Sequence, residues 1–387
     1  MELYPHQTLS NVPARKFILA DEQGLGKTVT ALVYLQHKMP LLVVCKSALL
    51  ENWYRECKTW LPNRSICKIG REPFNPRADV YLVTFDVSAR RQNLEIVHNK
   101  QLLMVAHRLK GVIIDEAHYI KNVQTIRSIG LLDIIRKTDD VIFLTGTPLV
   151  NDPKETAVLL EALGLGDGWN RFIQSISKLP RKQQYDIAKR WLETNAIIRR
   201  TKKQLFPDFP EIERRFIRIN NCVTSPEQMG FSEIAKWRKL SGVAKVGEVA
   251  EYARQIGRKT VIFAHHKAVQ DALVSLLPNC LYLLSDGDFE RVERHKNLFQ
   301  TSDKHPYIVC SLTADAEGHT LTAASDIIFA EMPWTETALQ QAEARCYGRL
   351  NDLHGATSHI MMCNNSIDRK LRHKIMVKGA ASSHLFR

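Results

Sequence analysis

Residues 21–28 read Asp-Glu-Gln-Gly-Leu-Gly-Lys-Thr, and this stretch indicates an α/β fold that binds a nucleotide. Its two glycines carry no Cβ, so the backbone can wrap closely around phosphate oxygens. A helix expected over residues 28–37 offers free N–H groups and its positive dipole end to the same anion. Lys27 is placed to reach the outer phosphates, and the Thr28 hydroxyl to ligate Mg²⁺. The strict phosphate-loop pattern has glycine at Asp21, so the stretch alone also fits a surface turn.

A second motif follows further along the chain, where residues 111–118 read Gly-Val-Ile-Ile-Asp-Glu-Ala-His. An apolar run that ends in carboxylates is typical of a buried parallel strand reaching the carboxyl edge of its sheet. Asp115 would hold Mg²⁺ through oxygen, and Glu116 would polarise the water that attacks the γ-phosphate. Because this motif follows a phosphate loop in the order a doubly wound sheet requires, the two together predict a nucleoside triphosphatase.

Length and net charge agree with a protein of two domains that binds a polyanion. A chain of 387 residues exceeds the size at which one core stops growing, so two domains are expected. The net charge of +13 suits RNA, DNA or an acidic membrane surface as partner. No apolar stretch is long enough to span a bilayer, and the start of the chain lacks the pattern of a signal peptide, so we expect no membrane association and an intracellular location.

The cysteines predict a reducing compartment rather than a disulfide framework. Eight are present without a Cys-x-x-Cys pair. Cys45, Cys310 and Cys363 fall in apolar strand patterns, so most cysteines are expected to be reduced core residues of a cytosolic protein. A zinc site is not expected.

Strands and helices are predicted to alternate throughout, which indicates parallel sheets. Helical spacing of Leu49, Trp53, Cys57 and Trp60 indicates core packing rather than base stacking. Residues 151–190 are expected to be helical, with further helices near 290–300, 336–347 and 367–378. The expected strands cover residues 41–45, 80–84, 112–114 and 141–144, then 261–264, 281–284, 307–311, 327–330 and 359–362.

The motifs, in chain order, resemble those of superfamily 2 helicases. The octet, Asp115-Glu-Ala-His and Leu144-Thr-Gly-Thr-Pro look like motifs I, II and III, and the octet is most similar to that of SWI/SNF-type DNA translocases. Strings in 263–267 and 329–331 point to the annealing-helicase (HARP-like) branch. Further segments resemble motif Ia, the junction before the second lobe, and motifs IV, V and VI, at residues 43–53, 198–210, 261–267 with 286–287, 311–326 and 341–345.

This resemblance implies an α/β architecture of two tandem RecA-like lobes, each a mostly parallel sheet flanked by helices, with the nucleotide site in the cleft between them. We expect lobe 1 over 1–205 with a helical protrusion near 151–190, a linker over 206–226, and lobe 2 over 227–387. The implied activity is an ATPase, with Mg²⁺, that couples hydrolysis to translocation on double-stranded DNA and to fork remodelling or strand annealing.

The resemblance also assigns roles to residues. Lys27, Asp115 and Glu116 are the catalytic candidates, joined by Arg345 as an arginine finger. The second motif VI arginine, Arg349, stands one residue beyond its usual spacing, and which arginine acts as the finger stays open. The other candidates are Gln7, Gln23, Gly24, Leu25, Gly26, Thr28 and Gly318 for the nucleotide, Thr28 and Asp115 for the metal, and Lys46, Ser47, Thr84, His265, His266, Lys267, Ser311 and Thr313 for nucleic acid.

Several alternatives stay open at the level of sequence. The catalytic motifs also fit an RNA helicase of the same superfamily, and the shifted arginine fits a clamp that binds ATP but hydrolyses it weakly. His265 and His266 fit a structural role at a strand end as well as a contact to nucleic acid. The expected partner is double-stranded or branched DNA, with a separate targeting protein as an option. A compact bacterial or phage motor is one expected origin, and a nuclear location is the alternative for a eukaryotic one.

Overall fold

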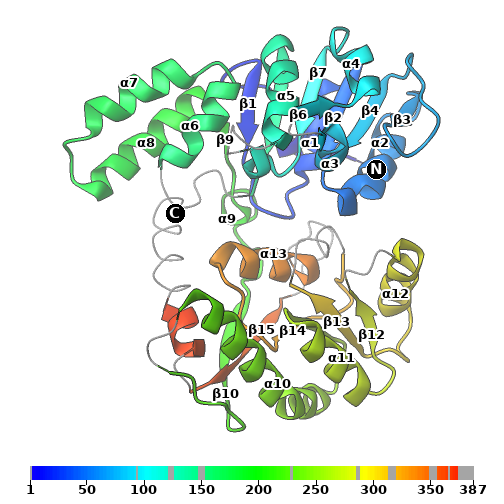
Figure 1. The fold of residues 1–387 in the computed structure, drawn as a ribbon, viewed down its shortest axis with the longest axis vertical. Helices are drawn as coiled ribbons and strands as arrows, with labels where there is room; N and C mark the ends of the chain where they lie inside the picture. Colours follow the sequence, from blue (N-terminus) through cyan, green and yellow to red (C-terminus); the bar gives the residue numbers. More distant parts are fainter. Residues whose placement is uncertain are drawn as a thin grey trace. The chain divides into compact units, whose positions relative to one another are not determined.

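The computed structural model describes residues 2–92, 95–120, 126–146, 153–226, 230–284, 288–312, 320–347, 355–364 and 367–373. The chain divides into two compact units, the first made mainly of Met1–Pro207 and the second of Asp208–Ser383 (Figure 1). Each unit contains its own parallel sheet and its own apolar core.

Unit 1 is built on a seven-stranded sheet in which every neighbouring pair is parallel, in the order β3-β4-β2-β7-β8-β1-β9. The central strands are continuous apolar runs because both faces of a parallel sheet are covered. The strands are β1 (Lys16–Leu19), β2 (Leu41–Cys45), β3 (Ile66–Lys68), β4 (Val80–Thr84), β7 (Gly111–Ile114), β8 (Asp140–Leu144) and β9 (Ile197–Ile198).

Strand β1 shows how this sheet separates two cores. Phe17 and Leu19 pack into the core that includes side chains of α1 (Lys27–Leu35) and α2 (Leu50–Trp60), whereas Ile18 packs into the core on the opposite face. Successive strand residues point to opposite faces, which explains the division. The opposite core includes side chains of α4 (Lys100–Ala106), α5 (Ile126–Lys137), α6 (Pro153–Ala162), α7 (Gly166–Ile176) and α8 (Arg181–Asn195).

Short elements complete unit 1. A two-stranded antiparallel hairpin forms a sheet of its own, and α6 contacts α7, which contacts α8 (Figure 1). The remaining elements are η1 (Pro5–Gln7), η2 (Ser47–Leu49), α3 (Phe85–Ser88), β5 (Ala89–Gln92), β6 (Glu95–His98), η3 (Ala117–Ile120) and α9 (Lys202–Leu205).

Unit 2 is built on a six-stranded, all-parallel sheet in the order β10-β15-β14-β11-β13-β12. Its helices are α10 (Phe231–Ile256), α11 (Lys267–Leu276), α12 (Phe289–Thr301) and α13 (Glu336–Cys346), and residues 367–373 are also helical. The strands are β10 (Glu213–Ile219), β11 (Thr260–Ala264), β12 (Leu281–Leu283), β13 (Tyr307–Ser311), β14 (Asp326–Phe329) and β15 (Thr357–Cys363).

The nine strands expected from the sequence are present, within a residue or two at their ends. The structure adds short or exposed strands that the sequence did not indicate, namely β1, β3, β9 and the β5–β6 hairpin. It also differs from the linker expected over 206–226, because residues Glu213–Ile219 form strand β10 at the edge of the second sheet. Four of those seven residues are charged and they occupy both faces of the strand, which conceals the strand pattern.

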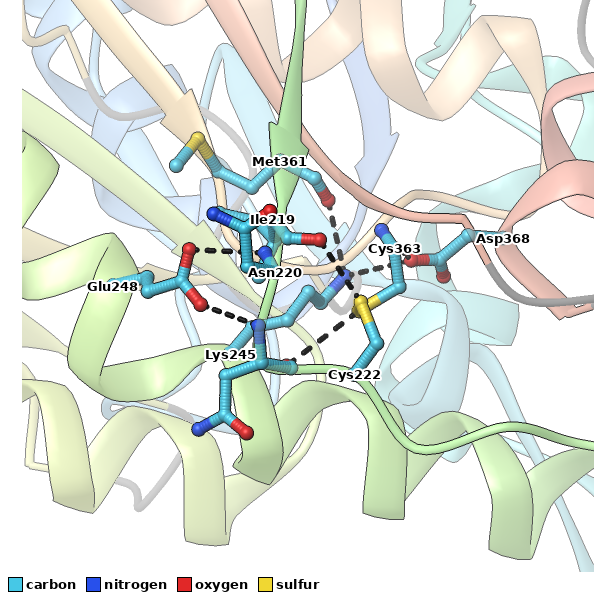
Figure 2. Close-up of a disulfide and its surroundings, with 9 residues drawn as sticks. Ile219, Asn220, Cys222, Lys245, Glu248, Met361, Cys363 and Asp368 are labelled. Atoms are coloured by element: carbon cyan, nitrogen blue, oxygen red, sulfur yellow. Dashed lines mark hydrogen bonds and ion pairs between the residues drawn. A yellow bond between two sulfur atoms is a disulfide. The ribbon is translucent and has the colours of Figure 1, made fainter.

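One cysteine prediction is wrong. Cys363, expected to be a reduced core residue, forms a disulfide with Cys222, with the two Cα atoms 5.5 Å apart (Figure 2). The pair joins the segment after β10 to the end of β15 across a sequence separation of 141 residues, which is why adjacency in sequence gave no sign of it. The other six cysteines are free thiols: Cys45, Cys57, Cys67, Cys280, Cys310 and Cys346.

The described residues contain neither a cluster of metal ligands nor a membrane-spanning helix. No group of three or more His, Cys, Asp or Glu side chains there is arranged to hold a metal ion. In the same residues, no helix is both long and apolar enough to cross a bilayer.

Candidate nucleotide site

The loop between β1 and α1 has the backbone that the octet predicts. Gly24 and Gly26 adopt φ values of +88° and +79°, in the left-handed region that side chains disfavour. A Cβ at Gly26 would also overlap the side-chain amide of Gln7. The backbone conformation therefore favours glycine at residue 26, whereas the Gln7 amide, at the end of a flexible side chain, could move aside. Helix α1 starts directly after it at Lys27, so its first N–H groups face the loop.

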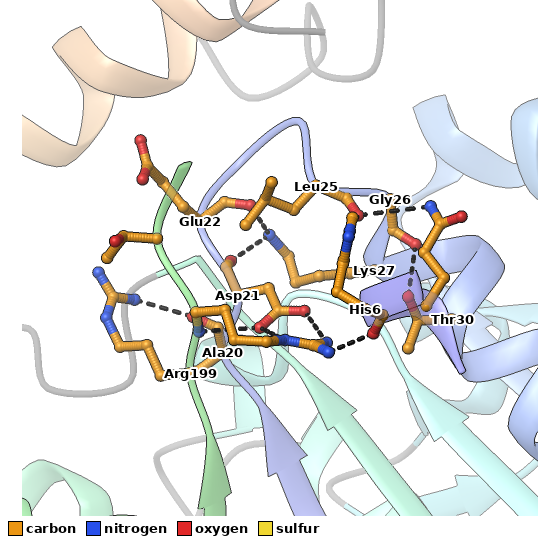
Figure 3. A network of polar contacts seen from close by, with 12 residues as sticks. His6, Ala20, Asp21, Glu22, Leu25, Gly26, Lys27, Thr30 and Arg199 are labelled. Atoms are coloured by element: carbon orange, nitrogen blue, oxygen red, sulfur yellow. Dashed lines mark hydrogen bonds and ion pairs between the residues drawn. The ribbon is translucent and has the colours of Figure 1, made fainter. Parts of the chain in front are cut away.

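The Lys27 ammonium is held inside this loop. Its Nζ donates to the carbonyl oxygens of Asp21 at 2.7 Å and Glu22 at 3.3 Å (Figure 3). Burial lowers the pKa of Lys27, while the carboxylates of Glu116, Asp21 and Asp115 act in the opposite direction. Within the described residues these two carbonyls are the acceptors of the Lys27 ammonium, and the residue is partly exposed. Lys27 Nζ can therefore replace its hydrogen bonds to those carbonyl oxygens with contacts to the oxygens of a polyanion.

Asp21 occupies the position where the strict pattern has glycine, and the structure explains its presence. Its side chain is fully buried. The carboxylate accepts hydrogen bonds from the Arg200 backbone N–H at 3.0 Å and from Nε at 2.9 Å, and it forms an ion pair with Nη2 of the same residue. The Arg200 guanidinium also donates to the His6 carbonyl. Asp21 thus anchors the start of the phosphate loop to the segment that ends unit 1.

Two neighbours of Arg200 reinforce that anchor. Arg199 Nη1 donates to the Ala20 carbonyl at 2.8 Å and to the Gly146 carbonyl at 3.3 Å, so one guanidinium joins the ends of β1 and β8 (Figure 3). The Lys202 backbone N–H donates to the Glu22 carboxylate at 2.8 Å. The sequence analysis missed these roles, although the Arg-Arg-Thr-Lys string at 199–202 was noted as a junction.

The N-terminal segment covers the other side of the loop. His6 Nε2 lies 3.0 Å from the Leu25 carbonyl, and the Gln7 amide lies 3.5 Å from the same oxygen. Gln7 Oε1 accepts from the Tyr4 backbone N–H at 3.0 Å. Gln7 is therefore placed against the phosphate loop, as expected, while its part in adenine recognition stays a prediction. His6 is a further contact that the sequence analysis did not identify.

Asp115 follows the end of β7 and is held by a tryptophan. Trp53 Nε1 donates to Asp115 Oδ2 at 2.8 Å, and the Trp53 ring is almost completely buried. Burial, together with the neighbouring Glu116 carboxylate, raises the pKa of Asp115 to about 6. The expected core role of Trp53 is confirmed, and its indole N–H adds an orienting bond to a catalytic candidate.

Glu116 has the backbone conformation of a residue under local constraint. Its φ is +47°, which is uncommon outside glycine and is frequent at functional sites. Glu116 Oε2 lies 3.2 Å from His118 Nδ1. Burial raises the pKa of Glu116, but His118, Lys27 and Lys46 outweigh it and hold the pKa below the ordinary value. Glu116 is therefore an ionised carboxylate, as a residue that orients water must be.

The remaining loop candidates lie at the same edge of the sheet. The Gln23 amide is next to Gly146, where an added Cβ would come within 3.2 Å of Gln23 Nε2. Leu25 is fully buried and offers its carbonyl to His6. Thr28 is the second residue of α1, so its hydroxyl lies in the first helical turn.

The nucleic-acid candidates of unit 1 follow the ends of β2 and β4. Lys46 Nζ lies 4.1 Å from the centre of the Tyr119 ring, and Ser47 Oγ accepts from Arg71 at 3.0 Å. Thr84 is buried at the last position of β4. Their contact to nucleic acid stays a prediction.

The candidates of unit 2 follow β11 and β13, and one carboxylate organises two of them. Glu331 accepts from the backbone N–H groups of His265 and His266, each at 2.8 Å, and from His266 Nδ1 at 2.5 Å. These contacts support the structural alternative for His266. Lys267 begins α11, and Ser311 is buried at the end of β13.

Arg345 is the one finger candidate within the described residues. Its side chain is largely buried in the last turn of α13, with the guanidinium 5.3 Å from the centre of the Phe263 ring. Arg349, Gly318 and Thr313 lie outside the described residues.

A phosphate loop with an inward lysine, followed by a strand ending in an ordered Asp-Glu pair, defines a nucleoside triphosphatase of the helicase type. Residues 8–236 match the SNF2-related domain, and residues 243–350 match the helicase conserved C-terminal domain. The first match covers more than half of the sequence. The chain therefore belongs to the SNF2-related family and is an ATP hydrolase with two RecA-like lobes.

Curated relatives agree with that assignment. The chain is 27% identical to the SWI/SNF-related matrix-associated actin-dependent regulator of chromatin subfamily A-like protein 1 of Xenopus laevis, over 95% of this chain and 42% of the relative. It is also 27% identical to the human DNA annealing helicase and endonuclease ZRANB3, over 91% of this chain and 37% of the relative. The chain thus spans about two fifths of the length of these relatives, and the annealing-helicase resemblance is confirmed.

Solved structures of the same family are also similar. The Sulfolobus solfataricus SWI2/SNF2 ATPase core in complex with dsDNA aligns over 95% of this chain and 90% of that one, with 20% identity and a TM-score of 0.42. A second structure, the Sulfolobus solfataricus SWI2/SNF2 ATPase core domain, aligns over 100% of this chain and 92% of that one. Its identity to this chain is 19% and its TM-score is also 0.42.

Proposed function

We propose that this chain is a DNA-dependent ATPase that couples hydrolysis to translocation along double-stranded DNA, with fork remodelling or strand annealing as the result. The observation that carries the proposal is the arrangement of charge in unit 1. There the Lys27 ammonium interacts electrostatically with Asp115 and Glu116 at the carboxyl edge of one parallel sheet. Membership of the SNF2-related family supports ATP as the nucleotide.

The side chains at this edge fit a magnesium ion. Asp115 provides a buried carboxylate and Thr28 a hydroxyl in the first turn of α1, and Mg²⁺ prefers hard oxygen ligands of these kinds. Asp115 and Thr28 would hold the ion, which would supply positive charge to offset the charge that develops on the transferring phosphoryl group. Trp53 would keep Asp115 oriented toward that position through its 2.8 Å hydrogen bond.

The residues of the chain would act in a simple sequence. Lys27 exchanges the carbonyls of Asp21 and Glu22 for phosphate oxygens, while the N–H groups at the start of α1 hold the same phosphates. Glu116 orients a water molecule toward the γ-phosphate, because its lowered pKa keeps it an acceptor. His118 Nδ1 lies beside this carboxylate, 3.2 Å from Glu116 Oε2.

DNA as the partner rests on the family and on charge. One relative is named a DNA annealing helicase, and the net charge of +13 favours a polyanion. Contacts from Lys46, Ser47, Thr84, the 265–267 segment, Ser311 and Thr313 would be made to phosphates. Phosphate contacts carry no sequence information, so binding is expected to be non-specific and to weaken steeply with salt.

A test of the catalytic role uses Glu116→Gln. The amide keeps the shape but cannot act as the carboxylate, so turnover is expected to fall by about 10²-fold or more while ATP affinity changes little. Exposed Glu51→Gln on α2 is the matched control and should behave as wild type. Equal loss of affinity and turnover in Glu116→Gln would contradict the assignment.

Translocation is tested by displacement of a third DNA strand. The protein is given a duplex that carries a short triplex-forming strand and no free end at which unwinding could begin. Directional movement predicts ATP-dependent release of the third strand by wild type and none by Glu116→Gln. ATP hydrolysis without release of the third strand would contradict translocation.

A second candidate function is a nucleic-acid clamp gated by ATP and hydrolysing it weakly. The burial of Arg345 against Phe263 favours it, because a finger must reach the transferring phosphoryl group. The two candidates differ in turnover: a clamp binds ATP and DNA together without strong stimulation of hydrolysis by DNA.

A further inference from the structure

Unit 2 contains a pocket whose lining residues lie outside the helicase motifs. Its volume is about 280 Å³, and it lies where β10 and β15 end beside the helical residues 367–373. The wall residues come from β10 and, much later in the sequence, from the end of β15 and the helical residues that follow it, and the parallel β10–β15 pairing brings the two regions together. They are Phe216, Ile217, Arg218, Met362, Cys363, Asn364, Arg369 and Arg372.

The pocket is positively charged. Arg218, Arg369 and Arg372 are exposed, and within the described part of the chain no ion pair joins any of their guanidinium groups to a carboxylate. Three exposed arginines line one small pocket, so an anion bound there would be attracted by all three. Arginine is also the side chain whose planar fork fits a phosphate best.

Asp368 precedes Arg369 in the sequence, and its carboxylate is paired with a lysine. Asp368 is buried behind the wall, where its Oδ2 lies 3.2 Å from Lys245 Nζ and accepts from the Cys363 backbone N–H at 2.8 Å (Figure 2). Lys245 is also buried and donates to the Met361 carbonyl at 3.0 Å. Lys245 and Asp368 therefore form a buried ion pair, whereas the three arginines of the pocket are exposed.

An aromatic ring stands among the arginines. Phe216 is 41% exposed although it lies in a β-strand, and the Arg372 guanidinium lies 4.4 Å from its ring centre. Exposed aromatic rings beside arginines are the usual platform on which unpaired bases stack. An acidic peptide would use the guanidinium groups but would leave this ring in contact with water.

We propose that this pocket binds a single nucleic-acid strand, with one backbone phosphate among Arg218, Arg369 and Arg372 and an unpaired base on Phe216. A base inside a duplex is stacked and cannot reach the ring, so the site selects unpaired strands. It lies wholly within unit 2 and is separate from the nucleotide site of unit 1. The inference rests on the proposed function and extends it, because the pocket would let the DNA translocase bind the unpaired strand of a branched substrate.

The test measures binding of a fluorescent, unpaired oligothymidine to the full chain by anisotropy over a range of salt. For single strands, log K changes with log salt by about 0.7 per phosphate contact. Arg218→Gln, Arg369→Gln and Arg372→Gln should therefore each reduce the slope by about 0.7, if each guanidinium contacts a phosphate. Phe216→Leu should weaken binding about fivefold or more with an unchanged slope, because it removes stacking and no charge.

Arg215→Gln is the matched control. Arg215 lies on the same strand but points to the opposite face, and its guanidinium is already paired with Glu213 at 2.6 Å. Its slope and affinity should equal those of wild type. Thermal unfolding midpoints confirm that the exposed substitutions leave the fold intact.

Three outcomes would overturn the proposal: unchanged slopes in all three arginine variants, equal loss in Arg215→Gln, or displacement of the oligothymidine by polyglutamate of matched charge at equal concentration. The last would show that the pocket takes acidic peptides. Stimulation of ATP hydrolysis by duplex DNA is measured on the same variants. If it persists while the slopes do not change, the pocket assignment fails and the proposed motor function stands.

Discussion

Asp21 replaces the glycine of the strict phosphate-loop pattern, and a partner elsewhere in unit 1 compensates its charge. Glycine at this position would leave room in the loop, whereas Asp21 brings a buried carboxylate that must be compensated. Arg200 supplies that compensation through its backbone N–H and its guanidinium. The departure and its partner are separated by 179 residues, so the sequence alone could not connect them.

This pairing leads to a prediction about Arg200→Ala. The substitution leaves a buried, unpaired carboxylate, which is expected to cost about 3 kcal/mol of unfolding free energy. The double variant Asp21→Gly with Arg200→Ala should recover most of that loss, because it removes the orphaned charge and restores the strict glycine pattern. Urea unfolding of the four proteins in the cycle measures the effect. A double variant no more stable than Arg200→Ala would contradict the pairing.

Among the elements, helix α11 depends on a carboxylate from another part of unit 2. Glu331 follows β14 and accepts hydrogen bonds from the backbone N–H groups of His265 and His266, just ahead of α11, and from the His266 ring. Burial raises the pKa of Glu331, but the hydrogen bonds from His266 and His265 outweigh it and hold the pKa below the ordinary value. The folded state therefore favours the ionised form.

The lowered pKa of Glu331 makes the stability of the protein depend on pH. Because the pKa of Glu331 is lower in the folded state, its stabilising contribution is present above the ordinary glutamate pKa and is lost as pH falls through the lowered value. Glu331→Gln should destabilise the protein by about 2 kcal/mol near neutral pH. The difference from wild type should begin to shrink as pH falls below the ordinary glutamate pKa, about 4.3, and should disappear once the pH has passed below the lowered pKa of the folded state. Unfolding midpoints of wild type and Glu331→Gln across this pH range test the prediction. A stability difference that does not change with pH would contradict the role of the ionised Glu331 carboxylate.

The same scale shows what the sequence could and could not predict. Fully buried parallel strands such as β2, β4 and β13 are visible as apolar runs, because both of their faces are covered. The edge strand β10 carries arginines on both faces, so the rule that finds buried strands cannot find it. The Trp53–Asp115 bond was also beyond prediction, since it depends on how α2 packs against the sheet.

For the whole molecule, the order of the motifs was the most informative part of the sequence. The phosphate loop and the Asp-Glu pair predicted a nucleoside triphosphatase, and the SNF2-related match over residues 8–236 agrees with them. The disulfide and the arginine pocket could not be predicted, because each depends on β10 lying beside β15. Contacts between segments distant in sequence become visible only in the folded unit.

The central claim is that ATP hydrolysis by this chain depends on duplex DNA. Its most direct test is steady-state ATP turnover at saturating ATP, with and without a linear duplex, and with a single-stranded RNA of equal length in a parallel sample. Lys27→Ala, which removes the phosphate-facing ammonium, sets the background. We predict that duplex DNA raises wild-type turnover at least about tenfold, that RNA does not, and that Lys27→Ala stays at background throughout. Equal turnover with and without duplex DNA, or stimulation by RNA alone, would contradict the account.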